Sequence, residues 1–171
     1  DSQSAAGGQG LIATESLRRA EAGESLTSVT KAAEYVRDRI RLLASVDTLF
    51  YLWKGGRVPR LAHAGASLLR IKPTFEMYES KIVTVARPRT SKRALSKLLE
   101  LMADRIAGLK VHACVMHAAS GEAAEELHER VQREFDCVET YVSEFSPVMG
   151  AHIGPGLLGI AFWPEQSESC R

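Results

Sequence analysis

Long apolar runs are missing from this sequence, and no segment stays apolar over the roughly 20 residues that a membrane-spanning helix needs. Cysteines are also scarce, because only Cys114, Cys137 and Cys170 occur and no pair has CxxC spacing. An odd, small number of cysteines argues against a disulfide framework and favours a reducing compartment. The sequence does not begin with a basic segment followed by an apolar one, so no secretory signal is predicted. We therefore expect a cytoplasmic protein.

An excess of one charge is missing as well. The 171 residues include 22 basic and 21 acidic side chains, so bulk electrostatic binding to nucleic acid or to an anionic membrane is not indicated. The charges are unevenly spread, since residues 54–93 carry 10 basic and 2 acidic groups, a net charge of +8. We interpret this stretch either as an anion-facing surface or as solvated charges, and the sequence supports both readings equally.

Motifs of common enzymes are absent. The sequence has no GxxxxGK[ST] phosphate loop, no GxGxxG, no GxSxG elbow and no HExxH pair. His112, Cys114 and His117 are close in sequence, but a strand would turn His117 away from the other two, so we predict no metal site. The length and the 45% apolar content fit one globular domain of ordinary size.

Apolar periodicity predicts a mixture of helices and strands. The predicted helices cover residues 11–22, 25–43, 48–53, 91–107 and 121–135. The predicted strands cover residues 74–78, 82–86, 111–116, 138–143 and 158–163, and a strand over 42–46 competes with the end of the second helix. The strand, helix and strand within residues 111–143 indicate a parallel βαβ unit and hence an α/β fold.

Three segments have residues that suit anion binding. The turn Lys54-Gly55-Gly56-Arg57 places a guanidinium after two glycines, although spacing alone favours a helix end with a surface arginine. The glycine- and proline-rich loop 146–156 follows a strand and holds His152, which could bond an anion or its own loop. The Ser- and Gly-rich start, residues 1–10, opens a helix and could cradle an anion, but this signal is weak.

Taken in order, these segments resemble the DegV family. The similar stretches run from Asp1 to Trp163 and read DSQSAAGGQGL, VDTLFYLWKGGRV, LLRIKP, VARPRTSKRAL, VHACVMHA and YVSEFSPVMGAHIGPGLLGIAF. The resemblance implies a bacterial, two-lobed α/β protein that binds one long-chain fatty acid between its lobes. It further implies that the protein is a carrier rather than an enzyme, and that it presents the acyl carboxylate to a fatty acid kinase subunit. No cofactor besides the fatty acid is implied.

The family's head-group residues carry over at two positions. The arginine of KGGR falls on Arg57 and the histidine of GAHxGPG falls on His152. An acyl chain needs a long apolar groove, for which the candidate tunnel residues are Leu68, Leu69, Ile71 and Phe75; ordinary core packing explains these four equally well. The chain departs from the family at Ala6, Ile153 and Arg70, where serine, threonine and asparagine are usual.

The family pattern also begins upstream of this sequence. Its Thr-Ser-x-Pro-Ser and Leu-Ser-Gly-Thr motifs, whose hydroxyls hold the carboxylate, do not occur here. We therefore expect a fragment in which 1–53 is the remainder of the N-terminal lobe, 54–163 the C-terminal α/β domain and 164–171 a tail. The stripe of Leu26, Val29, Val36 and Ile40 would then be partly exposed to a missing lobe or to a second copy.

Two other functions stay open. One is a small-molecule phosphotransferase or hydrolase that uses His152 as acid–base and Arg57 as phosphate clamp, although no paired carboxylates or activated nucleophile accompany them. The other is a structural fragment that is inactive without its partner lobe.

Overall fold

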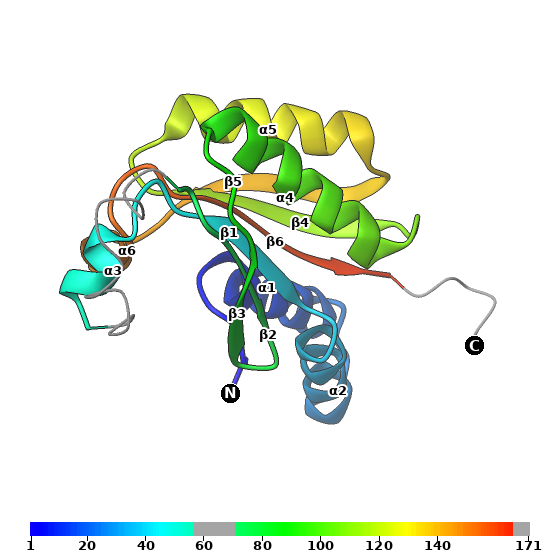
Figure 1. Ribbon diagram of the computed structural model, residues 1–171. Helices are drawn as coiled ribbons and strands as arrows, with labels where there is room; N and C mark the ends of the chain where they lie inside the picture. Colours follow the sequence, from blue (N-terminus) through cyan, green and yellow to red (C-terminus); the bar gives the residue numbers. More distant parts are fainter. Residues whose placement is uncertain (57–70, 166–171) are drawn as a thin grey trace.

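The computed structural model describes residues 1–56 and 71–165, in which six strands form one sheet in the order β3-β2-β1-β6-β4-β5 (Figure 1). The strands are β1 (Arg41–Ser45), β2 (Thr74–Tyr78), β3 (Lys81–Ala86), β4 (Val111–His117), β5 (Cys137–Glu144) and β6 (Leu158–Pro164). The helices are α1 (Gly7–Glu21), α2 (Leu26–Arg37), α3 (Phe50–Lys54), α4 (Ser91–Ile106), α5 (Gly121–Glu134) and α6 (Pro147–Ile153). Helices α1 and α2 lie on one face and α4 and α5 on the other, which confirms the α/β class.

The strand directions place the carboxyl ends of three strands at the same edge of the sheet. β4 and β5 are parallel and are joined by α5, which confirms the predicted βαβ unit. β6 runs antiparallel between β1 and β4, so β1, β4 and β5 all point the same way and end at the same edge. We call this edge the carboxyl edge, and α3 and α6 both begin just beyond it.

The central strand β1 separates two apolar layers. Leu43 points toward α4 and packs with Leu98 and Phe162, whereas Leu42 and Ala44 point toward α1. Side chains alternate along a strand, so a strand covered on both faces has consecutive apolar residues, as β1 has at Leu42, Leu43 and Ala44. Burial of both layers is the main source of stability for this architecture.

The second predicted helix ends earlier than expected. Ser25 caps α2 as predicted, since its Oγ accepts a hydrogen bond from the Ser28 N–H at 3.3 Å, but α2 stops at Arg37 and β1 follows. The apolar residues of β1, which is buried on both faces, continue the apolar stripe of α2. The predicted helix therefore extended too far, to residue 43. Val36 and Ile40 are buried against the sheet, so the expected exposure is wrong for them, while Leu26 is 81% exposed.

Helix α1 begins at Gly7, although residues 7–10 were expected to belong to a loop before the helix. The Gly7 N–H lies 3.1 Å from Met116 Sδ, and a Cβ on Gly7 would lie 2.6 Å from Cys114 Sγ. Only glycine permits this approach, and it packs α1 on β4 and β6. The assignment of residues 1–53 to an N-terminal lobe of a longer protein stays a prediction.

Smaller differences concern caps and loops. Thr90 rather than Ser91 caps α4, and the short helix α3 begins at Phe50 without a cap from Asp47. The expected loop 146–156 contains α6. None of the helices in the described residues is both long and apolar enough to cross a membrane.

A buried ion cluster ties β2 to its neighbours. The Glu76 carboxylate, almost fully buried, receives hydrogen bonds from Arg105 Nε at 3.0 Å and Nη2 at 2.9 Å and from Arg41 Nη1 at 2.9 Å. The bonds from Arg105 come first in lowering the pKa of Glu76, and those from Arg41 add to them against the opposing effect of burial. The Arg41 guanidinium also lies 3.9 Å from the centre of the Tyr78 ring.

We expect Glu76→Gln to lower the free energy of unfolding by about 2 kcal/mol at pH 7, because two guanidinium groups lose their charged acceptor. Since the folded-state pKa of Glu76 is lowered, this contribution is present above the pKa of the unfolded chain and is lost as the pH falls toward the folded value. Urea unfolding at several pH values measures it. Glu100→Gln, which removes only an exposed pair with Lys97, is the control and should change stability by less than about 1 kcal/mol.

Candidate functional site

The carboxyl edge holds the segment that contains His152. Helix α6 contacts α3, and the loop after α6 packs closely on the segment after β1. At Gly154, with φ 79°, an added Cβ would overlap the Tyr51 ring; at Gly156, with φ 87°, it would lie 2.7 Å from Asp47 Cβ. The GAHIGPG pattern therefore has a structural reason, because two of its glycines are needed for backbone conformation and close contact.

His152 lies in the last turn of α6 and is half-buried. The residue after it, Ile153, packs against an apolar cluster on the α1 face of the sheet. The histidine thus lies between Ile153, which is half-buried, and the close contact of Gly154 with Tyr51. This arrangement places a titratable side chain at the edge where ligands of α/β proteins usually bind.

Two of the candidate tunnel residues lie on that same apolar cluster. Ile71 and Phe75 are half-buried and pack against it, and Phe75 pairs with Ala44 across β2 and β1. The structure therefore brings Ile71, Phe75 and the segment of His152 to one face of the sheet. Arg57, Leu68 and Leu69 lie outside the described residues, and their roles stay predictions.

The start of the chain runs across this face. The Gln3 carbonyl accepts a hydrogen bond from the Ser80 N–H at 3.2 Å, and Ala5 packs on the same apolar cluster. The N–H groups of Gly8 and Gly10 already bond the carbonyls of Ala5 and Ala6, so they are not available for the anion that residues 1–10 were expected to cradle. Ser4 Oγ is buried without a hydrogen-bond partner among the described residues. Sequence reasoning did not single out this hydroxyl, since a serine in a glycine-rich loop is common.

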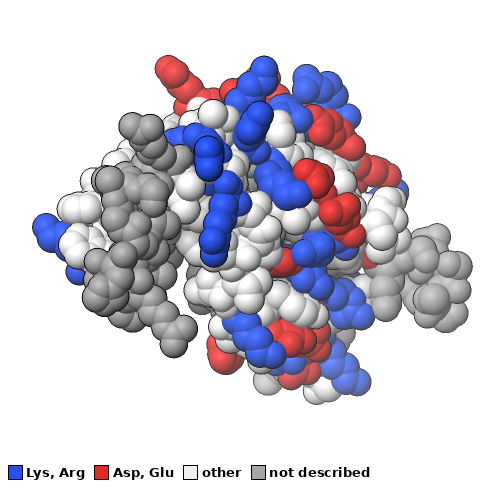
Figure 2. Space-filling model, viewed as in Figure 1, with Lys and Arg blue, Asp and Glu red and all other residues white. Residues whose placement is uncertain are grey.

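The basic stretch 54–93 is partly solvent-facing. Four side chains at the turn from β3 to α4 are exposed and form no ion pair with other described residues: Arg87, Arg89, Lys92 and Arg93. Figure 2 shows Lys and Arg gathered over this part of the molecule. Lys72 differs, because it pairs with Asp47. Exposed cations without ion pairs fit both the anion-facing and the solvated interpretation, so both stay open for the β3–α4 turn.

A small cavity at the carboxyl edge lies on the α4 side, between Lys72, Asp47 and Leu95, and has a volume of about 30 Å³. It is too small for an acyl chain. A cavity of about 910 Å³ lies at the opposite end of the strands, between α1, α2 and the start of β5. Charged side chains such as Arg19, Glu24 and Lys31 line it, so it does not suit an acyl chain either.

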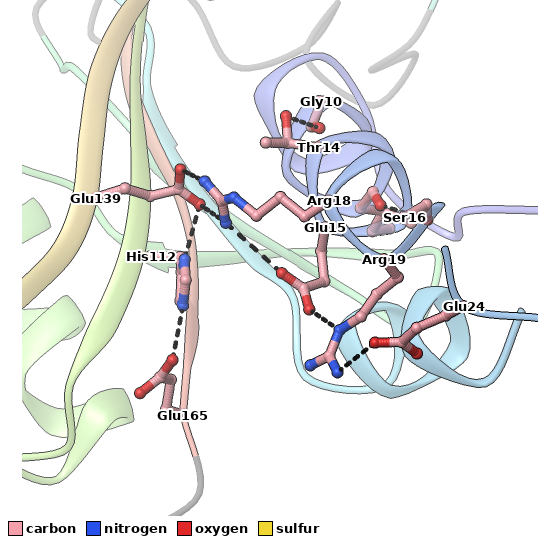
Figure 3. Close-up of polar contacts among 11 residues, drawn as sticks. Gly10, Thr14, Glu15, Ser16, Arg18, Arg19, Glu24, His112, Glu139 and Glu165 are labelled. Atoms are coloured by element: carbon pink, nitrogen blue, oxygen red, sulfur yellow. Dashed lines mark hydrogen bonds and ion pairs between the residues drawn. The ribbon is translucent and has the colours of Figure 1, made fainter. Parts of the chain in front are cut away.

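A chain of polar contacts borders the larger cavity (Figure 3). Arg18 on α1 forms an ion pair with Glu139, whose Oε1 is 2.7 Å from His112 Nδ1, and His112 Nε2 is 3.1 Å from Glu165 Oε1. The buried His112 ring stacks on Trp163 with ring centres 4.1 Å apart. Burial raises the pKa of Glu139, but the bonds from Arg18 and His112 outweigh it and hold the pKa below its usual value. No sequence spacing could reveal this cluster, because its members come from four separate segments of the chain.

The histidine and cysteine group at β4 has other partners. His117 Nδ1 accepts a hydrogen bond from the Ser120 N–H at 3.3 Å, whereas Cys114 is buried beneath Gly7. Burial raises the pKa of the Cys114 thiol to about 11, so it stays protonated at neutral pH. Within residues 1–56 and 71–165, no group of three His, Cys, Asp or Glu side chains is arranged to hold a metal ion.

The similar proteins described below come from bacteria. A family model described as an uncharacterised protein of the DegV family matches residues 1–165. The DegV protein of Bacillus subtilis is 33% identical over 164 residues, covering 95% of this chain and 58% of that protein. A DegV domain-containing protein of Streptomyces coelicolor is 35% identical over 152 residues, covering 88% of this chain and 54% of that protein. The chain thus spans little more than half the length of these relatives.

Solved structures of DegV family proteins have the same fold as this chain. A DegV family protein from Thermus thermophilus, described with fatty acid binding, has a TM-score of 0.86 and 27% identity, covering 96% of this chain and 60% of that one. DegV from Bacillus subtilis, described as a fatty acid binding protein, has a TM-score of 0.80 and 31% identity, covering 96% of this chain and 59% of that one.

Gly154→Ala tests the packing that holds α6 on α3. We expect it to lower the free energy of unfolding by about 2 kcal/mol, because alanine is strained at φ 79° and its Cβ overlaps Tyr51. Chemical denaturation measures the change. Gly150→Ala is the matched control, since no atom lies within 4 Å of its added Cβ and alanine favours the helix. An equal effect of both substitutions would contradict the packing argument.

Proposed function

Because the chain belongs to the DegV family, we propose that it forms part of a protein that binds one long-chain fatty acid. The observation that supports this most is the half-buried apolar surface on the α1 face of the sheet, next to His152 at the carboxyl edge. Ile71 and Phe75 contribute to that surface, and the chain passes over it at Ala5. The fatty acid binding described for relatives from Thermus thermophilus and Bacillus subtilis points the same way.

The energetics of an acyl ligand fit such a surface. Burying a chain of about sixteen carbons contributes on the order of 10 kcal/mol at about 0.8 kcal/mol per CH₂, before the costs of association. In the proposed arrangement the tail lies against Ile71 and Phe75, with Leu68 and Leu69 as further tunnel residues. The carboxylate lies at the end near His152, where Arg57 would donate two parallel hydrogen bonds.

Presentation to a kinase subunit is the finer part of the proposal. The end of β3 is at the carboxyl edge, since Ala86 pairs with Thr74 and Thr74 with Ser45. The exposed cations Arg87 and Arg89 therefore lie at the same edge as His152. A partner that reaches the acyl carboxylate would meet this basic surface, and an acidic face on the partner would complement it.

The enzymatic alternative has less support. A histidine that acts as general base is usually oriented by a carboxylate or another acceptor. Among the described residues, no hydrogen bond or ion pair joins His152 to a carboxylate, whereas the histidine that is held in this way, His112, lies at the other end of the strands. We therefore propose a carrier without catalytic activity of its own.

Arg57→Ala tests the proposed head-group site. We expect it to weaken fatty acid binding or presentation by tens of fold, because a charge-assisted hydrogen bond is typically worth about 1.5–3 kcal/mol. His152→Ala should also weaken it, and Lys54→Ala, which removes a nearby cation, should have little effect. Titration with a fluorescent fatty acid measures the affinities. Equal, small effects of all three substitutions would overturn the assignment.

The contribution of an upstream segment to fatty acid affinity can be measured directly. We expect the 171-residue chain to bind a fatty acid more weakly than a version extended at its start with the upstream segment of a relative, because the family's carboxylate-holding hydroxyls belong to that segment. Parallel titrations of the two proteins decide this. Equal affinity would mean that the upstream segment adds nothing and that the whole site lies within this chain.

A further inference from the structure

The outer strand β3 is exposed on both faces over residues 81–84 and has no neighbouring strand at its outer edge. Ile82 is 63% exposed and Val83 is 53% exposed, although they point to opposite faces of the sheet, and Lys81 and Thr84 are exposed as well. β3 is the last strand of the sheet beside β2, and Figure 1 shows it at the margin of the sheet. Edge strands are usually protected by charges, prolines or bulges, because their free backbone groups pair with other strands.

The hairpin geometry decides which backbone groups of β3 face outward. β2 and β3 are joined by a two-residue turn, Glu79-Ser80, in which both residues have positive φ. In such a hairpin the flanking pair Tyr78 and Lys81 exchanges hydrogen bonds, and pairing alternates from there. The N–H and C=O groups of Ile82 and Thr84 therefore point away from β2. In the described part of the chain, no backbone bond to another segment uses them.

The sequence of β3 is complementary to itself. If a second β3 pairs antiparallel about a twofold axis at Val83, each Ile82 lies opposite Thr84 of the other copy, and these pairs make four hydrogen bonds. β-branched side chains then face each other across the junction, which favours pairing. Within the paired segment no like charges lie directly opposite each other.

The start of β3 limits this pairing to the strand itself. The Ser80 N–H, the next outward group, is already bonded to the Gln3 carbonyl. At the other end a bulge interrupts the register between β2 and β3 near Ala86. The free edge is thus a short segment. It is long enough to pair with one other β3 about a twofold axis, but not to form a longer ladder.

We propose that β3 is a docking edge for a second copy of this chain, paired antiparallel about Val83. The two sheets become one continuous sheet of twelve strands. The interface lies away from the α2 stripe from which an association was expected, since Val36 and Ile40 of that stripe are buried within one copy.

Light scattering on a concentration series of the whole chain tests the proposal. We expect a dimer that dissociates on dilution, and Val83→Lys should raise its dissociation constant at least tenfold, because two ammonium groups would face each other at the axis. Leu26→Lys is the matched control, because it places the same charge at an exposed leucine of α2 and should leave the dimer intact. Circular dichroism of both variants checks that each copy still folds.

Cross-linking tests the register. Val83→Cys should form a disulfide between copies on mild oxidation, because residues opposite each other in a non-hydrogen-bonded pair have Cα atoms about 4.5 Å apart. Ile82→Cys, one residue away, faces Thr84 of the other copy and should cross-link no more than the parent chain. A monomer at all concentrations, a dimer insensitive to Val83→Lys, or equal cross-linking of both cysteine variants would overturn the proposal.

Discussion

Close approach of glycine backbone to packed side chains is the constraint on which this structure depends. Gly7 brings the start of α1 against Cys114 and Met116 of β4, so that α1 covers the middle of the sheet. Gly154 and Gly156 bring the α6–β6 segment against Tyr51 and Asp47. A side chain at any of these positions would push a helix away from the sheet edge. The position of His152, and of the apolar face beside it, follows from these contacts.

Ion pairs then connect parts of the chain that differ in charge. Glu76, one of the two acidic residues in the basic stretch, is held by Arg41 and Arg105 from the segments on either side. Arg18 and Glu139 join the first helix to the edge strand β5. Such pairs lie between elements distant in sequence, and leaving one partner buried alone is costly. They therefore favour one arrangement of the helices on the sheet.

Size alone does not identify the ligand site. The cavity of about 910 Å³ is bordered by charges that neutralise one another, whereas the surface beside His152 is apolar and only partly covered. A fatty acid requires the second kind of environment, since its burial is driven by removal of CH₂ groups from water. Cavity size and side-chain chemistry thus point to different ends of the same strands, and the proposed fatty acid site follows the chemistry.

The sequence by itself determined the α/β class, the βαβ unit, the strands β2 and β3 and the family. Apolar periodicity is a local signal, and the family is indicated by the order of its motifs along the chain, so neither needs tertiary contacts. It also indicated Ile71, Phe75 and His152 as site candidates, but not that Ile71, Phe75 and the segment carrying His152 meet on one apolar cluster. Tertiary structure alone decided that α2 ends at Arg37, since a strand buried on both faces reads like a helix stripe. It alone assembled His112 with Arg18, Glu139 and Glu165, because these residues come from α1, β4, β5 and the residue after β6, and contacts between such distant segments leave no regular spacing in the sequence.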